Sequence, residues 1–239
     1  MQTLLDNSIS AIFFITTTKI KFWWDILSAK LLEPKIINDS DYYIFCEMIQ
    51  MLGNGFQIEK EIDQESLLKV LKWKNNDNNT LFNRFKAFRL IVTDLEQNNF
   101  NIKNKILSMI NNMSKVERDF SYLYNKKFTN YHTIGAHCMN HYDLSKLSFE
   151  NQKNEIEGSK LKLECLIDDN VDIFAYPFGM RYNYDNNSIN LVKKYYKAGF
   201  SNFEGLVHQD SNIFELPRFL VRDWSESEFK YRINKFFNN

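Results

Sequence analysis

Residues Thr133–His141 read TIGAHCMNH, and this stretch decides how the rest of the chain can be interpreted. Its short apolar first half predicts a buried strand over 131–137 that ends at His137. His141 follows four residues later, so two of the four histidines lie together just beyond a strand end. Two imidazoles at this spacing can bind one divalent metal ion if the backbone between them turns. The same spacing also arises by chance in histidines that only pack structurally.

Strands and helices alternate after residue 131. The pattern predicts strands over 131–137, 171–176, 200–203 and 219–221, and helices over 149–167, 188–198 and 225–236. Gly199 fits the C-cap position of the second helix, and Ser225 with Glu228 fits a capping box that opens the third. A further buried strand is expected over 9–16. This alternation predicts an α/β fold with a parallel sheet or barrel, in which strand carboxyl ends carry the chemistry.

The middle of the chain has a different pattern. Residues 21–128 are mostly amphipathic runs of helical period, broken by Gly53-Asn54-Gly55 and by a polar turn over 75–79. We therefore expect a mainly helical insertion between the strand at 9–16 and the strand at 131–137.

Composition excludes several classes of function. Thirty Lys and Arg residues balance thirty Asp and Glu residues, so no basic field exists to attract nucleic acid or anionic lipid. No stretch approaches the length of a membrane span. The three cysteines, at 46, 138 and 165, are scattered and odd in number, which favours reduced thiols over a disulfide framework. No signal peptide is evident in the printed sequence, which leaves the compartment open: cytoplasmic, or exported if the true N-terminus lies upstream.

Four blocks resemble one known family. IGAHCMNHYDLSKLS (134–148) resembles the His-[Ser/Thr]-x-x-His segment of the polysaccharide deacetylases, the NodB-homology family of carbohydrate esterases. FAYPFG (174–179), LPR (216–218) and AIFFIT (11–16) resemble further blocks of that family in order and spacing. The resemblance is dense over 131–239 and thin over 18–130. It implies one deacetylase-like domain over 1–239, a distorted (β/α) barrel with a helical insertion over about 21–128.

The resemblance also implies a chemistry, the metal-dependent removal of an acetyl group from an N-acetylated or O-acetylated polysaccharide or oligosaccharide. By position, His137 and His141 would bind the divalent metal, usually zinc in this family, and the Phe178 N–H would stabilise the oxyanion. Arg218 would replace the arginine that orients the family's catalytic base, since Ala175 stands in its place. His208 is the candidate general acid. The alternatives are a plain turn at Phe178, a surface ion pair at Arg218 and a solvated loop residue at His208.

One family block is absent. The resemblance places an Asp-Asp pair, which supplies a metal ligand and the base, at the end of a strand that precedes residue 9, and the printed sequence has none there. We therefore expect the first strand to be missing, the sequence to be N-terminally incomplete and the chain as given to be inactive. The alternatives are a non-catalytic, glycan-binding pseudoenzyme and a metal hydrolase that acts on a non-sugar amide.

Overall fold

The chain forms two compact units. The computed structural model describes residues 2–18, 21–71, 83–97, 100–113, 118–222 and 224–237, so the turn expected over 75–79 lies outside the described residues. One unit comprises Met1–Lys19 with Asp119–Asn239, and the other comprises Ile20–Arg118. The first is named the sheet unit and the second the helical unit.

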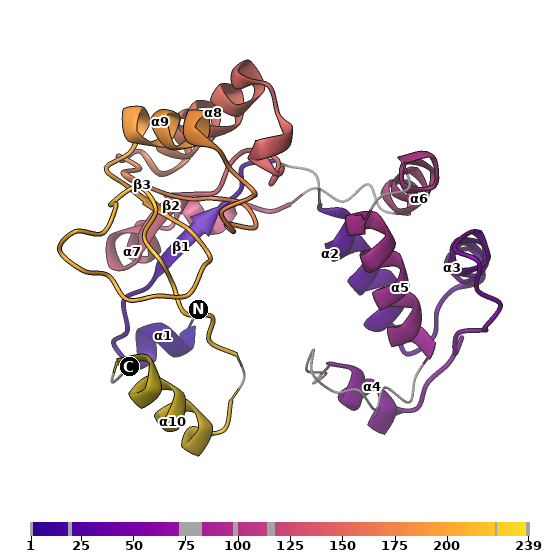
Figure 1. Ribbon diagram of the computed structural model, residues 1–239. Helices are drawn as coiled ribbons and strands as arrows, with labels where there is room; N and C mark the ends of the chain where they lie inside the picture. The colour runs from indigo at the N-terminus through magenta and orange to yellow at the C-terminus, as the bar shows by residue number, and fades with distance from the viewer. Residues whose placement is uncertain are drawn as a thin grey trace. The chain divides into compact units, whose positions relative to one another are not determined.

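Four short parallel strands organise the sheet unit. β1 (Ile12–Ile15), β2 (Thr133–Ala136), β3 (Ile173–Ala175) and β4 (Ala198–Phe200) lie in that order in the sheet. Figure 1 labels the first three. Because all neighbours are parallel, the four carboxyl ends meet at one edge of the sheet. The predicted α/β fold with a parallel sheet is confirmed. The described residues form an open sheet with β1 and β4 at its edges, and they do not close a barrel.

Helices cover this sheet. α8 (Phe149–Ile167) and α9 (Asn186–Tyr195) pack against each other, α8 also contacts β2, and α9 also contacts β4 (Figure 1). Asp185 caps α9, because its carboxylate accepts a hydrogen bond from the Ser188 N–H at 2.9 Å. The prediction of a helix over 149–167 is confirmed with the same bounds. The remaining helices of this unit are α1 (Gln2–Asp6), α7 (Lys126–Tyr131) and α10 (Glu226–Phe237).

A stripe of α8 side chains faces the core of the sheet unit. The buried members recur three or four residues apart, the spacing of one helix face. They are Gln152, Glu155, Ile156, Ser159, Leu163 and Ile167. This stripe therefore carries polar groups as well as apolar ones into the interior.

Two expectations near the last strand are wrong. α9 ends at Tyr195, and Gly199 lies inside β4 instead of capping the helix. A Cβ at Gly199 would come within 2.5 Å of the Phe214 carbonyl oxygen, because residues 213–216 run close beside β4. The strand expected over 219–221 does not form, and the pairing beside β4 is a single parallel bridge between Phe200 and Leu216.

The helical unit has its own core. Its helices are α2 (Trp23–Leu27), which continues as a π-helical segment (Ser28–Leu32), α3 (Asp39–Met51), α4 (Gln64–Leu71), α5 (Asn83–Gln97) and α6 (Phe100–Asn112). The fully buried guanidinium of Arg84 donates to the backbone carbonyls of residues 34, 35, 59 and 60. No helix in the described ranges has the length and apolar character that crossing a membrane requires.

Candidate active site

His137 leaves the carboxyl end of β2 with a fixed ring. Its backbone N–H donates to the Ile15 carbonyl oxygen at 3.0 Å, which continues the β1–β2 pairing by one residue. Its Nδ1 lies 2.6 Å from the Ala175 carbonyl oxygen at the end of β3. A carbonyl oxygen can only accept, so Nδ1 carries the proton and Nε2 keeps the lone pair. Metal-binding histidines typically have this arrangement, with the other ring nitrogen held by a carbonyl or carboxylate.

The backbone turns sharply after His137 and brings His141 back to it. Cys138 (φ 60°) and His141 (φ 57°) both have left-handed backbone conformations, which are uncommon for residues other than glycine. The two imidazole centroids lie 4.8 Å apart with an interplanar angle of 77°. The rings therefore come close enough to serve one metal ion as two of its ligands.

Burial sets the charge state of this pair. Burial, followed by the nearby His141, lowers the pKa of His137 to about 4, so its ring is neutral at pH 7. A neutral imidazole is the form that binds a metal ion. Cys138 is fully buried between the histidines, and burial raises the pKa of its thiol well above the usual value. Cys138 therefore serves as a small core residue at this turn.

The loop after β3 lies against His141. Phe178 has a φ of 58°, and its ring packs edge-on against the His141 ring with centroids 4.9 Å apart. Gly179 (φ 69°) makes a tight turn, with its N–H 2.6 Å from the Pro177 carbonyl oxygen. The structure thus brings His137, His141 and Phe178 together at the carboxyl edge of the sheet.

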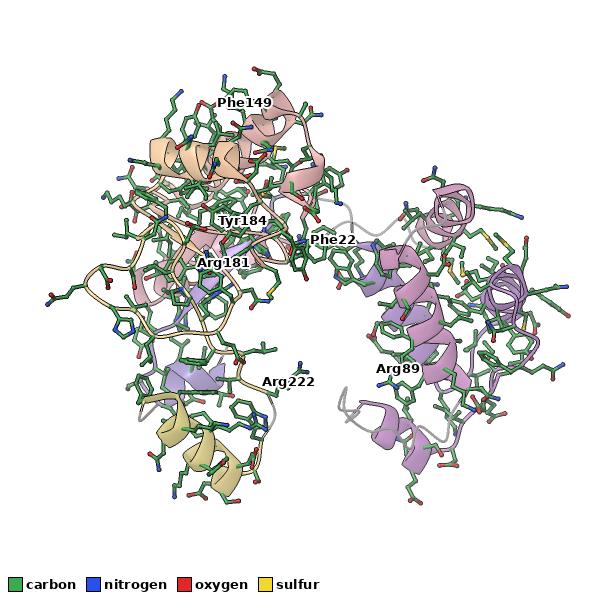
Figure 2. All side chains as sticks on the ribbon, in the orientation of Figure 1. Phe22, Arg89, Phe149, Arg181, Tyr184 and Arg222 are labelled. Atoms are coloured by element: carbon green, nitrogen blue, oxygen red, sulfur yellow. The ribbon has the colours of Figure 1, made fainter. Side chains whose placement is uncertain are left out.

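Asn183 joins these two loops, and sequence reasoning missed it. Its amide donates to the Asp143 carboxylate at 2.9 Å, two residues after His141. Its side-chain oxygen accepts the Met180 N–H at 3.2 Å, two residues after Phe178. Next to it in sequence, Tyr184 lies within the sheet unit (Figure 2). Its ring stacks on the Tyr176 ring, with centroids 4.1 Å apart. An asparagine in a polar loop resembles any turn residue, so only its burial and partners reveal this bridge.

The two remaining candidate residues, Arg218 and His208, differ in how near they lie to the histidine pair. Arg218 is partly buried, its Nε donates to the Ser201 carbonyl oxygen at 2.6 Å, and its charge helps to lower the pKa of His137. His208 lies in an exposed turn that its backbone closes through Ser211. Among the described residues, no hydrogen bond or ring contact joins His208 to His137. Arg218 is therefore near the site, while His208 is not brought to it.

Part of the chain matches the model of a known protein family. Residues 96–198, somewhat less than half of the chain, match the model of the polysaccharide deacetylase family. This part of the chain is therefore similar to the polysaccharide deacetylases. The match includes His137, His141 and Phe178 and ends before His208 and Arg218. A search of the curated proteins found no match.

The solved structures that resemble this chain are distant from it in sequence. A polysaccharide deacetylase from Bacillus cereus is 24% identical over 44% of this chain and 32% of its own, with a TM-score of 0.38. This chain therefore spans about a third of that protein. A Streptococcus pyogenes deacetylase in complex with acetate is 15% identical over 93% of this chain and 96% of its own, with a TM-score of 0.43. A Bacillus anthracis pseudoenzyme of the CE4 family is 15% identical over 33% and 28%, with a TM-score of 0.29.

Proposed function

We propose that the function of this protein is the hydrolysis of an acetyl group from an N-acetylated or O-acetylated polysaccharide or oligosaccharide with a bound divalent metal ion, zinc. We propose further that the printed chain, which has no Asp-Asp pair before residue 9 to supply the base, is inactive by itself. The observation that carries the proposal is the convergence of His137 and His141, whose rings are 4.8 Å apart. The Ala175 carbonyl oxygen holds Nδ1 of His137 and so leaves Nε2 with its lone pair for a metal. The similarity of residues 96–198 to the polysaccharide deacetylase family supports the same chemistry.

The proposed domain organisation follows from how β1 and β2 pair. They are adjacent parallel strands, yet more than a hundred residues separate them in sequence. We propose that 1–239 is one deacetylase domain of distorted barrel type and that about 21–128 is a mainly helical insertion between β1 and β2 in the sequence. The helices of the insertion have a core of their own, which supports this proposal.

Each candidate residue has a proposed role. A bound zinc ion would supply Lewis-acid polarisation of the acetyl carbonyl and a water of lowered pKa. His137 and His141 would hold it, and the Phe178 backbone N–H would donate to the oxyanion. The Arg218 charge would orient the base, and His208 would protonate the leaving amine if its turn closes over the substrate.

The two histidines account for only part of a ligand set. Within the described ranges, no group of three or more His, Cys, Asp and Glu side chains could hold a metal ion. Water or substrate oxygens would have to complete the coordination. Zinc binding to this chain is therefore expected to be weaker than binding to a site with three protein ligands.

Zinc titration against a chromophoric competitor tests the site. Replacing His137 or His141 with Ala should weaken zinc binding by about tenfold or more, because each removes a ligand. His208→Ala is the matched control, since it removes an exposed histidine and should leave zinc affinity unchanged. Equal affinity in all four proteins would refute the proposed metal site.

Acetate release tests the activity separately. In the presence of zinc, the printed chain should release no acetate, because it has no Asp-Asp pair before residue 9 to supply the base. A variant with a strand ending in Asp-Asp joined ahead of residue 1 should release acetate from acetylated oligosaccharides and not from simple non-sugar amides. In that variant, Arg218→Ala should lower turnover and leave zinc affinity intact, because Arg218 acts on His137 through its charge and would not be a metal ligand. Zinc binding and glycan binding without acetate release in that variant would instead favour the non-catalytic, glycan-binding function.

A further inference from the structure

Glu155 of α8 is a buried carboxylate that contacts the turn between the two histidines. Its side chain lies in the interior, and the residue is only 6% exposed. Oε2 accepts hydrogen bonds from the backbone N–H groups of Met139 at 2.9 Å and Asn140 at 2.8 Å. Oε1 accepts a third from Nδ2 of Asn140 at 2.7 Å. One side chain therefore holds two consecutive peptide groups of the turn.

The turn needs such support because its backbone is strained. Cys138 and His141 flank the held residues, and both have positive φ angles. Left-handed conformations of non-glycine residues persist only where their surroundings impose them. Hydrogen bonds to a carboxylate are among the strongest that a protein can supply for this purpose. The bonds from Glu155 therefore stabilise the conformation that brings the two rings together.

Two further contacts confine the same turn. Gly158 lies three residues after Glu155, on the same face of α8, and a Cβ there would come within 2.7 Å of the Met139 sulfur. On the other side, the N–H of Thr18 donates to the Met139 carbonyl oxygen at 2.8 Å. The turn is thus clamped between α8 and the segment that follows β1, with Glu155 as its only charged partner among these contacts.

We propose that Glu155 is a positioning residue that holds the 138–141 turn so that His137 and His141 converge, and thereby sets the affinity for the metal ion. This inference rests on the proposed metal binding by the two histidines. We assign Glu155 to the turn and not to the ligand set, because both of its oxygens accept hydrogen bonds from Met139 and Asn140.

The test compares Glu155→Gln with Glu157→Gln in the full chain. Glutamine is isosteric but neutral, and its amide would face the Asn140 amide, so the variant weakens the hold while it fills the space. Glu157 lies on the same helix with a half-exposed side chain near Lys153, so its replacement removes the same charge away from the turn. Thermal melting confirms that both variants are folded before they are compared.

Hydrogen exchange is the first measurement, and it needs no metal. The amides of Met139 and Asn140 should exchange about tenfold to a hundredfold faster in Glu155→Gln than in the unmodified chain or Glu157→Gln. Zinc affinity, measured by competition, should fall by about tenfold to a hundredfold in Glu155→Gln alone.

The outcomes separate this proposal from the proposed function. Unchanged exchange of the two amides in Glu155→Gln overturns the inference, whether or not zinc binds. Faster exchange with unchanged zinc affinity also overturns it, because Glu155 would then support the turn without setting the site. If the unmodified chain binds no zinc, the proposed metal site is wrong, and so is the claim that Glu155 sets zinc affinity. The exchange of the Met139 and Asn140 amides then shows separately whether Glu155 holds the turn.

Discussion

Gly179→Ala should destabilise the sheet unit through the loop that carries Phe178. Gly179 has a φ of 69°, where an alanine costs about 1–2 kcal/mol relative to its normal conformations. A Cβ built there would lie 2.8 Å from both the backbone nitrogen and the Cβ of Asn202, and 3.1 Å from the Tyr176 carbonyl oxygen.

The neighbours of that Cβ cannot move away cheaply. The Asn202 N–H donates to the Gly179 carbonyl oxygen at 2.8 Å, and the Tyr176 N–H donates to the Phe200 carbonyl oxygen at 3.0 Å. Relief of the overlap would therefore break backbone hydrogen bonds beside β3 and β4. Forced overpacking of this kind costs about 1–3 kcal/mol. Together with the backbone cost, the expected loss is about 2–5 kcal/mol.

Native-state hydrogen exchange of amides in β2, β3 and β4 measures this loss for the sheet unit itself. Gly205→Ala is the matched control, because its Cβ would meet only side-chain atoms of Pro217, at 3.2 and 3.4 Å. The control should cost less than about 1 kcal/mol. A loss in Gly179→Ala no larger than in Gly205→Ala would refute the argument that backbone crowding and positive φ require glycine at 179.

Three further measurements test other parts of the chain. A double-mutant cycle of Asp143→Ala and Asn183→Ala should give a coupling free energy of about 1.5–3 kcal/mol, because the buried Asn183 amide donates to the Asp143 carboxylate. Additive losses of stability would contradict this hydrogen bond. Alkylation of the native protein should label the exposed Cys165 quickly and the fully buried Cys138 only on unfolding. Equal labelling rates for the two cysteines would contradict the packing of the 138–141 turn. Arg84→Met should destabilise the helical unit by about 3–5 kcal/mol, because it removes a fully buried guanidinium that donates to several backbone carbonyls. Faster exchange of α5 amides measures this loss, and unchanged exchange would contradict the role of Arg84.

Local patterns predicted much of the sheet unit correctly. The apolar run before His137 forms β2, and the helix predicted over 149–167 has those bounds, because each pattern reflects which side of a single element is buried. The errors came where two segments approach each other. Gly199 was interpreted as a helix cap, while its actual requirement is space for the backbone at Phe214, which lies fifteen residues away.

The candidate site likewise contains residues that short sequence patterns indicated and one that only the packing revealed. Histidine spacing and family blocks were sufficient to select His137, His141 and Phe178, since those signals are contained in short stretches of sequence. Glu155 gave no comparable signal, because an amphipathic helix has many glutamates and most of them face solvent. Its burial against Met139 and Asn140 depends on how α8 packs beside the turn.

Short-range information in the amino-acid sequence was thus enough to establish the α/β alternation, the strand just before His137 and the pair of imidazoles four residues apart. These features depend on neighbours within a few residues, so periodicity and spacing report them. Other features arise only when separate segments meet at the carboxyl edge of the sheet. They are the tautomer of His137, the hydrogen bonds from Glu155 to the turn and the hydrogen bond between Asp143 and Asn183. Hydrogen bonds between distant segments require a specific distance and angle, and those are set by packing of the whole unit.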